Sequence, residues 1–344
     1  TASCSWSCAA TGDPAPAPGT APRVRVRTSE RLPGRRFRAT LAAEAPNPVA
    51  AATTTIEVGE RSIVLTSQSK KMFPDDGITK GELVDYYLEV APWMLPHVSG
   101  RPLTLQCYPA GIGGHKFYQK NTGEHFPEWM ARTTMLSKDE GETTYALADE
   151  AATLVYLANQ NCITFHVCSA RVPRLDRPDL LILDLDPSDS DFEKVRQGAQ
   201  ALRPMLTEAG LVPYVKTSGS RGLHVVAPIV PGDDHDAVRH FARNIAERLC
   251  RLEPELFTVE MSKKRRGTRV FVDYLRNGMA QTVAAPYTVR GLPGAPVATP
   301  LRWEELEDPA LHARSHTLRT VRDRLARHGD PWQHMQRDAR PLAD

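Results

Sequence analysis

Residues 180–188, Leu-Leu-Ile-Leu-Asp-Leu-Asp-Pro-Ser, form an apolar stretch that ends in two aspartates and a proline. In a β-strand alternate side chains share a face, so Asp184 and Asp186 would stand side by side, on the face of Ile182. Two adjacent carboxylates are costly unless a cation neutralises them. Pro187 cannot donate to a sheet ladder, so the acids are expected at the rim of a sheet. The stretch predicts a buried strand that ends in a divalent-metal site.

A third acid in a similar setting lies further along the chain. Asp273 follows the apolar residues 270–272, which again predict a short strand ending in a carboxylate. A two-metal site needs such an additional acid, and Asp273 is the candidate. The alternative is that Asp184 and Asp186 belong to a solvated turn, but the apolar strands that lead into these acids favour the metal site.

Residues 216–224, Lys-Thr-Ser-Gly-Ser-Arg-Gly-Leu-His, lie between the two acidic strands. The two glycines let the backbone turn sharply and approach a ligand closely, and the hydroxyls and the guanidinium suit an anion. The predicted phosphate cradle consists of Ser218, Ser220 and Arg221. The alternative for so short a pattern is a plain hairpin turn.

Two histidines lie beside these motifs, His166 in an apolar strand pattern and His224 at the end of the glycine-rich stretch. A lone histidine in a strand is most often a core residue. Two of them beside a phosphate cradle raise the alternative that both donate N–H groups to a triphosphate, a role that needs no tuned pKa.

Charge is nearly balanced over the whole chain but not locally. The 344 residues include 43 Lys and Arg against 41 Asp and Glu, a net charge of +2, which excludes a uniformly basic coat. Residues 258–290, however, contain seven basic side chains and two acidic ones. Lys263 and Arg266 belong to this run and precede the Asp273 strand. A basic run beside carboxylates is expected where a polyanion crosses, and a solvated basic turn is the alternative.

The remaining composition predicts a cytoplasmic protein. No stretch of about 18 apolar residues could span a membrane, and no basic segment precedes an apolar run as in a secretory signal. The six cysteines include no CxxC pair, so a structural zinc site is not expected and the thiols are predicted to be reduced. Residues 1–54, rich in Ala, Pro and Arg, are predicted to be a disordered low-complexity arm.

Helices and strands alternate through the rest of the chain. A capping box of Thr79 and Glu82 predicts a helix that ends near Pro92, and residues 151–159 predict a second helix. Beyond these, the expected strands are 163–167, 180–186, 212–217, 223–229 and 270–275, and the expected helices are 191–209, 236–251 and 312–327. This order predicts an α+β fold with helices packed on a sheet.

Three separated motifs carry a resemblance to a known family: LILDLDPSD, TSGSRGLHVV and VFVDYLRNGMAQTVAAPYTVRG. They resemble the archaeo-eukaryotic primase superfamily, in particular the bacterial branch found as the polymerase domain of DNA ligase D and as stand-alone actinobacterial primase-polymerases. The resemblance covers about residues 63–303. It implies a catalytic domain over 55–303, in which an N-terminal α/β module, about 55–160, packs on an RRM-like antiparallel-sheet module, about 161–303. Residues 304–344 would form a charged tail with one helix.

The resemblance implies template-dependent extension of DNA 3′-hydroxyl ends with two divalent metal ions, Mn²⁺ in preference to Mg²⁺. The substrates would be NTP or dNTP, with ribonucleotides preferred. By motif position, the metal ligands and catalytic residues are Asp184, Asp186 and Asp273. The nucleotide-binding residues are His166, Ser218, Ser220, Arg221, His224 and Arg290. The DNA-binding residues are Lys70 and Lys80 for a 5′-phosphate, Phe117 and Tyr118 for the template, and Arg266 for the primer or synaptic end, with Lys263 from the same basic run.

The expected role is short-gap filling in DNA repair and end joining, in the nucleoid, on gapped or overhanging 5′-phosphorylated DNA. No nuclease or ligase motif accompanies the polymerase motifs, which indicates the stand-alone type. A separate ATP-dependent DNA ligase and Ku are therefore the partners expected in trans. The chain departs from the family at Gln106 and Cys107, where ligase D relatives carry a Lys-Arg pair, and this puts one DNA or nucleotide contact in doubt.

Two other functions remain open from the residues alone. Asp184 and Asp186 at a strand end could be the nucleophile and general acid of an aspartyl phosphatase, although the basic loop and the aromatic pair have no part in that chemistry. A non-catalytic RRM-like single-strand binder could use Phe117 and Tyr118. Three strand-borne aspartates would repel a phosphate backbone in such a binder.

Overall fold

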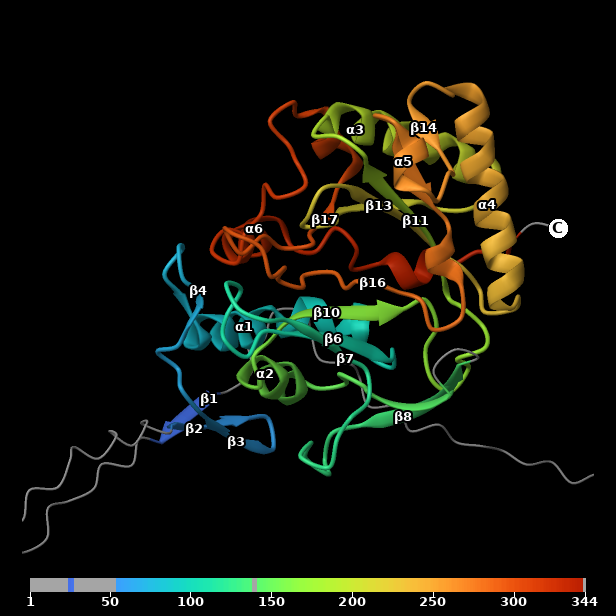
Figure 1. Cartoon of the computed structure of the whole chain (residues 1–344). Coiled ribbons are helices and arrows are strands. Elements are labelled where there is room, and N and C mark those ends of the chain that lie inside the picture. The colour runs from blue at the N-terminus through green and yellow to red at the C-terminus, as the bar shows by residue number, and fades with distance from the viewer. Residues whose placement is uncertain (1–23, 28–53, 138–140, 343–344) are drawn as a thin grey trace, which may run out of the picture.

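The computed structural model describes residues 24–27, 54–137 and 141–342 and arranges most of them around two sheets (Figure 1). The six-stranded sheet has the order β14-β15-β11-β13-β12-β17, in which only β14 and β15 are parallel. Its strands are β14 (Phe257–Thr258), β15 (Val270–Asp273), β11 (Leu180–Pro187), β13 (Leu223–Pro228), β12 (Tyr214–Thr217) and β17 (Pro300–Leu301).

The four-stranded sheet is antiparallel, in the order β16-β10-β6-β7. Its strands are β16 (Thr282–Ala284), β10 (Cys162–Cys168), β6 (Leu103–Cys107) and β7 (Phe117–Gln119). Smaller ladders flank it: β1 (Val24–Arg27), β2 (Thr54–Val58) and β3 (Arg61–Leu65); β4 (Lys71–Phe73) and β5 (Ile78–Thr79); β8 (Arg132–Ser137) and β9 (Gly141–Ala146). The predicted α+β fold with antiparallel sheets is confirmed.

Each of the two main sheets has its own pair of helices. Helices α3 (Phe192–Glu208) and α4 (His235–Leu252) cover the six-stranded sheet at the top of Figure 1. Helices α1 (Lys80–Val98) and α2 (Ala151–Asn159) pack on the four-stranded sheet, with Tyr87 of α1 stacked on Phe165 at 4.5 Å between ring centroids. The helices thus leave the space between the two sheets open to other side chains.

The alternation of side chains in β11 decides which face carries the acids. Leu181, Leu183 and Leu185 are fully buried against α3 and α4, whereas Ile182 belongs to the core of the other module. A register slip of one residue would turn the carboxylates into the leucine core, so burial of the leucines holds Asp184 and Asp186 on the opposite face. Each fully buried leucine contributes about 1.5–3 kcal/mol to that preference.

Helix α1 begins as predicted and ends later than predicted. Thr79 accepts a hydrogen bond from the Glu82 N–H, and Glu82 accepts one from the Thr79 N–H, so the capping box is present. The expected end near Pro92 is wrong, because the helix continues to Val98. Pro92 lies on the exposed side, where the missing N–H costs one hydrogen bond, while the buried residues Met94 and Val98 anchor the last turns.

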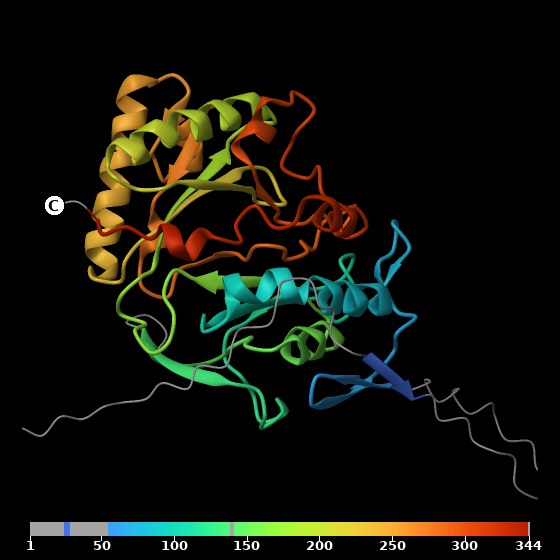
Figure 2. The same cartoon turned by 180° about the vertical axis from the view of Figure 1, so that it is seen from behind.

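The segment expected to be a charged tail is part of the core. Asp330 accepts hydrogen bonds from Tyr287 Oη (2.6 Å) and lies 2.7 Å from Nε2 of His97, while Trp332 Nε1 donates to Val215 O. Figures 1 and 2 show this red segment running between the six-stranded sheet and helix α1. The packed domain therefore continues past residue 303.

Short helical elements account for the rest of the C-terminal part. They are η2 (Trp303–Glu307), α6 (Val321–His328) and η3 (Met335–Asp338), and two more, α5 (Lys263–Arg266) and η1 (Leu275–Asn277), flank β15. The helix predicted for 312–327 is thus confined to its second half. His312 and Ser315 form a turn before this helix. In that turn the Ser315 hydroxyl accepts a hydrogen bond from the His312 N–H, so the helix does not extend back to residue 312.

Two further predictions differ from the structure. Residues Val24–Arg27 of the predicted disordered arm form strand β1, which pairs with β2, and the remainder of the arm before residue 54 lies outside the described residues. Cys107 and Cys162, on neighbouring strands, are joined in a disulfide, so reduced thiols are wrong for this pair. Cys168 and Cys250 are free.

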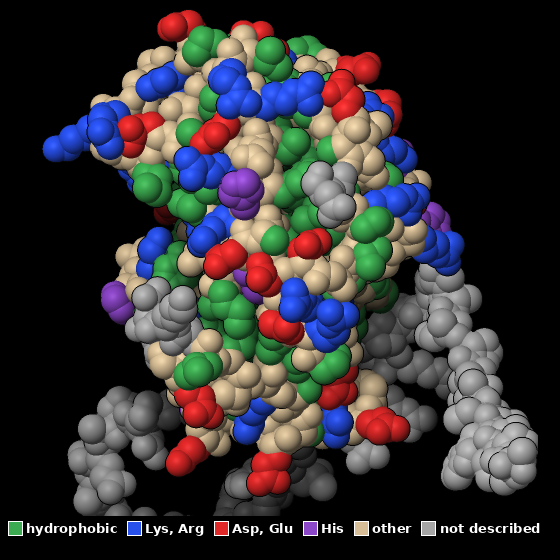
Figure 3. Space-filling model, turned by 90° about the vertical axis from the view of Figure 1, so that its right-hand side faces the viewer, with side chains coloured by type: hydrophobic (Ala, Val, Ile, Leu, Met, Phe, Trp, Pro, Cys, Tyr) green, Lys and Arg blue, Asp and Glu red, His purple; other side chains and the backbone are tan. Residues whose placement is uncertain are grey.

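The surface matches the balanced net charge. Figure 3 shows Lys and Arg side chains interspersed with Asp and Glu over the face it presents, without a uniformly basic area. Within the part of the chain that the structure describes, no helix combines the length and apolarity that crossing a membrane requires.

Candidate active site

Four ionisable side chains form one row across the six-stranded sheet. The Cα register pairs Lys216 of β12 with His224 of β13, His224 with Asp184 of β11, and Asp184 with Asp273 of β15. Directly opposed residues point to the same face of a sheet, so the row runs from a lysine to two carboxylates. Asp186 lies on the same face, opposite Phe271. The predicted third acid is therefore the immediate neighbour of Asp184.

The three aspartates are crowded, and the side chains of Asp184 and Asp273 are largely shielded from water. Burial, together with the negative charges of Asp186 and Asp273, raises the pKa of Asp184 to about 8. Burial also raises the pKa of Asp273. Carboxylates held together in this way are the donor set that divalent cations prefer, so these residues fit the metal site that the sequence implies.

An arginine partly compensates this charge. The Arg276 guanidinium lies 2.9 Å from Oδ2 of Asp273 and 3.8 Å from Oδ2 of Asp184. Nε2 of His224 lies 3.5 Å from Oδ1 of Asp184. No three His, Cys, Asp or Glu side chains among the described residues are gathered as a ready-made metal cluster. The carboxylates instead face a cationic side chain of the same protein.

Residues just after β15 hold the acidic strand in place. Asp273 Oδ1 accepts from the Leu275 N–H and starts η1, which brings the fully buried Asn277 beside β11. Asn277 Oδ1 accepts from the Ile182 N–H at 2.8 Å, and its Nδ2 donates to Ile182 O at 2.7 Å. The side chain thus continues the ladder where β15 ends and fixes the strand two residues before Asp184.

A cavity of about 380 Å³ lies beside the aspartates, between the two sheets. The six-stranded sheet and its hairpin supply the acids and the glycine-rich turn, and the four-stranded sheet supplies the opposite wall. The predicted residues that line it are Asp184, Asp186, Ser218, Ser220, His224, His166, Arg290 and Tyr118. Residues of five separate sequence regions therefore meet in one volume.

Backbone geometry explains the glycines of the cradle. A Cβ at Gly222 would lie 1.8 Å from Leu185 O, so only glycine lets the hairpin pack under the end of β11. Gly219 has a φ of +65° beside Arg290 and the backbone of Val297. The Ser218 hydroxyl accepts from the N–H groups of Ser220 and Gly222 and so shapes the turn itself.

Arg221 does not line this cavity. It lies with His312 and Arg314 in a neighbouring hollow of about 430 Å³, and Ser220 borders both. The guanidinium that the structure places at the cradle is that of Arg290, which donates to Ser218 O.

Both histidines are neutral and incompletely paired. Burial lowers the pKa of His166 to about 3, with the charges of Arg290 and Lys216 acting in the same direction. Burial likewise lowers the pKa of His224 well below its ordinary value, and Lys216 and Arg290 add to the effect. Nδ1 of each ring is buried without a hydrogen-bond partner. Buried polar atoms of this kind are rare unless a ligand pairs with them, so the core-residue alternative is disfavoured.

The predicted template pair lies on the edge strand β7. The side chains of Phe117 and Tyr118 are 40% and 59% exposed, so both rings are open to a stacking partner. Tyr118 also borders the cavity and lies 6.0 Å from the His166 ring. Gln106, the register partner of Tyr118, is buried in β6 and does not line the cavity.

Lys70 and Lys80 lie together in the N-terminal module. Lys80 Nζ donates to Asn159 O at 2.6 Å, and Lys70 Nζ donates to Asn161 Oδ1 at 3.0 Å. Burial, together with the charge of Lys70, lowers the pKa of Lys80 to about 8. Neither lysine forms an ion pair within the described residues, so the two ammonium groups leave a local excess of positive charge.

The basic run forms helix α5 and the approach to β15. Arg266 lies 3.7 Å over the ring of Phe271, which shares the face of the aspartates and opposes Asp186. Its Nε and Nη2 donate to the backbone oxygens of Glu260 and Met261. This position of Arg266 is consistent with the expectation that the basic run lies near the aspartates. Lys263, at the start of α5, is exposed.

Several cavity residues were not singled out by the sequence analysis. They are Thr104, Lys120, Arg276, Thr282, Val283 and Ala284. Arg276 was available as a signal, because it follows the Asp273 strand by three residues. Thr104 and Lys120 belong to no motif and reach the cavity because β6 and β7 pair beside β10.

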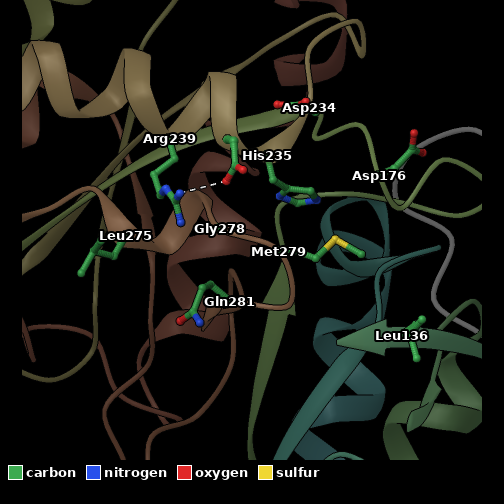
Figure 4. Close-up of a pocket in the computed structure, with 10 residues that line it drawn as sticks. Leu136, Asp176, Asp234, His235, Arg239, Leu275, Gly278, Met279 and Gln281 are labelled. Carbon is green, nitrogen blue, oxygen red and sulfur yellow. Dashed lines mark ion pairs between the residues drawn. The ribbon is translucent and has the colours of Figure 1, made fainter. Parts of the chain in front are cut away.

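A larger hollow of about 660 Å³ lies on the other side of η1 (Figure 4). It contains none of the predicted site residues. Figure 4 shows Arg239 in this hollow. Arg239 forms an ion pair of 2.9 Å with Asp236 within α4. The titratable side chains of the hollow do not include unpartnered buried atoms, so the smaller cavity is the candidate active site.

Comparison with known proteins identifies the family of the chain. The family described as "LigD, primase-polymerase domain" matches residues 79–332. The chain belongs to the LigD primase-polymerase domain family. Among relatives, the Mycobacterium tuberculosis (strain ATCC 25618 / H37Rv) "Multifunctional non-homologous end joining DNA repair protein LigD" is 36% identical over 294 residues, which are 83% of this chain and 38% of that protein.

More distant relatives and a solved structure extend the match. The Bacillus subtilis (strain 168) "Bifunctional non-homologous end joining protein LigD" is 32% identical, over 78% of this chain and 43% of that protein. The chain thus spans about two fifths of the length of these LigD relatives. The structure "Polymerase Domain from Mycobacterium tuberculosis Ligase D in complex with DNA" superposes with a TM-score of 0.76 at 35% identity. The superposition covers 80% of this chain and 99% of the chain in that structure.

Proposed function

We propose that this LigD-type primase-polymerase domain extends DNA 3′-hydroxyl ends by template-dependent nucleotidyl transfer. The observation that carries the proposal is one cavity lined by Asp184, Asp186, Arg290 and two neutral histidines whose Nδ1 atoms have no partner. Asp273 lies directly opposite Asp184 on the neighbouring strand. An aspartyl phosphatase would not need the exposed aromatic pair at the cavity edge, and a non-catalytic binder would not need the acids.

Asp184, Asp186 and Asp273 would hold two divalent cations, Mn²⁺ in preference to Mg²⁺. Such ions supply positive charge that lowers the pKa of the attacking hydroxyl and stabilises the leaving pyrophosphate. The raised pKa of Asp184 is in keeping with this role, because a bound divalent cation would favour the charged carboxylate.

The residues of the chain itself would bind and orient the nucleotide, either an NTP or a dNTP. Arg290 and the cradle residues Ser218 and Ser220 would hold the triphosphate, and a fixed triphosphate keeps the α-phosphorus in line with the hydroxyl. His166 and His224 would pair with phosphate oxygens through ring N–H groups. Since both rings stay neutral at physiological pH, they would act as donors without transferring a proton.

DNA would be held by the residues outside the cavity. Phe117 and Tyr118 would stack on the template, Lys70 and Lys80 would bind the 5′-phosphate at a gap, and Arg266 with Lys263 would contact the primer end. Arg221, in the hollow beside Ser220, would approach the triphosphate from the outside. The substrate would be gapped or overhanging 5′-phosphorylated DNA in the nucleoid, with ribonucleotides preferred.

The cellular role proposed for this domain is short-gap filling in DNA repair by non-homologous end joining. The relatives whose names state that role support it. A DNA ligase and Ku would act beside it at the break.

Primer extension tests the proposal. The assay compares NTP with dNTP on a short-gapped 5′-phosphorylated duplex with Mn²⁺. The Asp184→Ala, Asp186→Ala double variant should lose extension by more than about 10³-fold, because no carboxylate pair remains to hold the metal. Asp236→Ala, an exposed acid on α4, is the matched control and should extend normally. Measurable extension by the double variant, or phosphate-ester hydrolysis without primer and template, would count against the proposal.

A further inference from the structure

Arg276 is placed as a counter-ion inside the candidate metal site. It lies in η1, directly after β15, and its guanidinium contacts Oδ2 of Asp273 at 2.9 Å and approaches Oδ2 of Asp184 to 3.8 Å. Its side chain is 34% exposed, whereas those of Asp273 and Asp184 are 4% and 14% exposed. A partly exposed arginine therefore reaches inward to two largely buried carboxylates.

Two further cations beside the acids, Arg290 and Lys216, donate to backbone oxygens. Arg290 donates to Ser218 O, and Lys216 Nζ donates to Thr217 O at 3.3 Å. Within the described residues, Arg276 is the only lysine or arginine in an ion pair with any of the three aspartates. The compensation of the buried carboxylates therefore depends mainly on this one guanidinium.

A metal ion and this guanidinium compete for the same carboxylate oxygens. A divalent ion binds carboxylate oxygens at about 2.0–2.2 Å, so a guanidinium nitrogen in hydrogen-bond contact with the same atoms would be displaced and repelled. Arg276 also lines the cavity opposite Arg290, where a triphosphate would lie. Because planar guanidinium groups pair well with phosphate as well as with carboxylate, the released side chain has a second partner within reach.

We propose that Arg276 exchanges partners, from Asp273 and Asp184 in the metal-free protein to the nucleotide phosphates in the loaded one. This inference rests on the proposed function, since it concerns the same metal and nucleotide sites. Its consequence is that Arg276 opposes metal binding in the absence of nucleotide and couples the two binding steps. Such coupling is reciprocal, and coupling factors between sites are typically about 5–150-fold.

Mn²⁺ binding to the full chain without nucleotide tests the first half of the exchange. Free Mn²⁺ is followed by electron paramagnetic resonance during a titration. Arg276→Ala should bind Mn²⁺ at least about fivefold more tightly than the wild type, because the carboxylates no longer have a competing cation. Arg239→Ala is the matched control, since Arg239 also pairs with an aspartate three residues away, at the same 2.9 Å, outside the site.

The second half is tested by repeating the titration with a saturating non-hydrolysable nucleoside triphosphate. The nucleotide should tighten Mn²⁺ binding more in the wild type than in Arg276→Ala, again by at least about fivefold. Chelation of Mn²⁺ by the nucleotide is common to both proteins and cancels in this comparison. Arg239→Ala should show the wild-type coupling.

Thermal melting checks that the Arg276 variants are folded, so that a change in Mn²⁺ binding is not caused by unfolding. In EDTA the Arg276→Ala and Arg276→Gln variants should both melt below the wild type, because their acids lack a counter-ion, and excess Mn²⁺ should narrow that gap. If both variants bind Mn²⁺ no more tightly than the wild type, the exchange is refuted. If Asp184→Asn still abolishes Mn²⁺ binding in that case, the proposed metal site stands and only the role of Arg276 falls. If the Asp184→Asn variant binds Mn²⁺ as tightly as the wild type, both the proposed metal site and the role of Arg276 are refuted.

Discussion

Asn277 holds the acidic strand at the point where its neighbour strand stops. Strand β15 pairs with β11 only from Asp184 to Pro187, so the backbone of Ile182 lies beyond the ladder. The Asn277 amide pairs with both main-chain groups of Ile182, at 2.8 and 2.7 Å, and also donates to Tyr274 O at 2.8 Å. One side chain thus takes the place of a strand in a fully buried position.

Replacing Asn277 by alanine should be strongly destabilising. The change leaves the N–H and C=O of Ile182 buried without a partner, and each such group costs about 1–3 kcal/mol, so the loss should be about 2–6 kcal/mol. Extension should fall as well, because Ile182 is two residues from Asp184 and its backbone would no longer hold the carboxylate in position.

Urea unfolding followed by circular dichroism measures this loss. Asn244→Ala is the control, because Asn244 is exposed on α4 and its amide makes a single 3.4 Å contact with His240. That variant should stay within about 0.5 kcal/mol of the wild type. A loss below about 1 kcal/mol for Asn277→Ala, or equal losses in the two variants, would refute the reasoning.

Two further variants test the cavity edge and its histidine. Tyr118→Ala should weaken binding of single-stranded template by about 1–3 kcal/mol, the contribution of one stacked base, in a fluorescence titration. Its ring is 59% exposed, so stability should not change; unaltered affinity would exclude stacking. Burial and Arg290 lower the pKa of His166 to about 3, against about 6.5 when unfolded, so acid protonates only the unfolded chain between these values. His166 should contribute about 1.4 kcal/mol per pH unit to the loss of stability on acidification, so His166→Gln should have a shallower slope than the wild type; equal slopes would contradict this.

Local signals predicted the elements that depend on neighbouring residues. The capping box of Thr79 and Glu82 and the helix at 151–159 both formed as expected, because their hydrogen bonds and apolar faces lie within a few residues of one another. The apolar alternation before Asp184 also predicted the correct face, since burying the leucines on one side of the strand turns the alternate residues to the other side.

Other expectations failed because distant segments decided them. A proline ends a helix reliably only when no tertiary contact stabilises the residues that follow it. Helix α1 continues beyond Pro92 because residues further along it are buried. The charged tail was read as an appendage, yet Asp330 and Trp332 in it pair with residues from three other regions. No pattern within the tail could reveal those partners.

The residue types and their order in the sequence predict the chemistry of this protein, but they do not predict the geometry of its site. Apolar strands ending in aspartate, and a glycine-rich turn between them, indicate metal and phosphate ligands because period-2 alternation and glycine stereochemistry are local properties. Strand pairing joins residues about ninety positions apart, and it alone places Asp273 opposite Asp184 and brings Thr104 and His166 to the cavity. The position of Arg276 beside the carboxylates follows from that pairing. The negative charge that Arg276 compensates is concentrated there only once the two strands have paired.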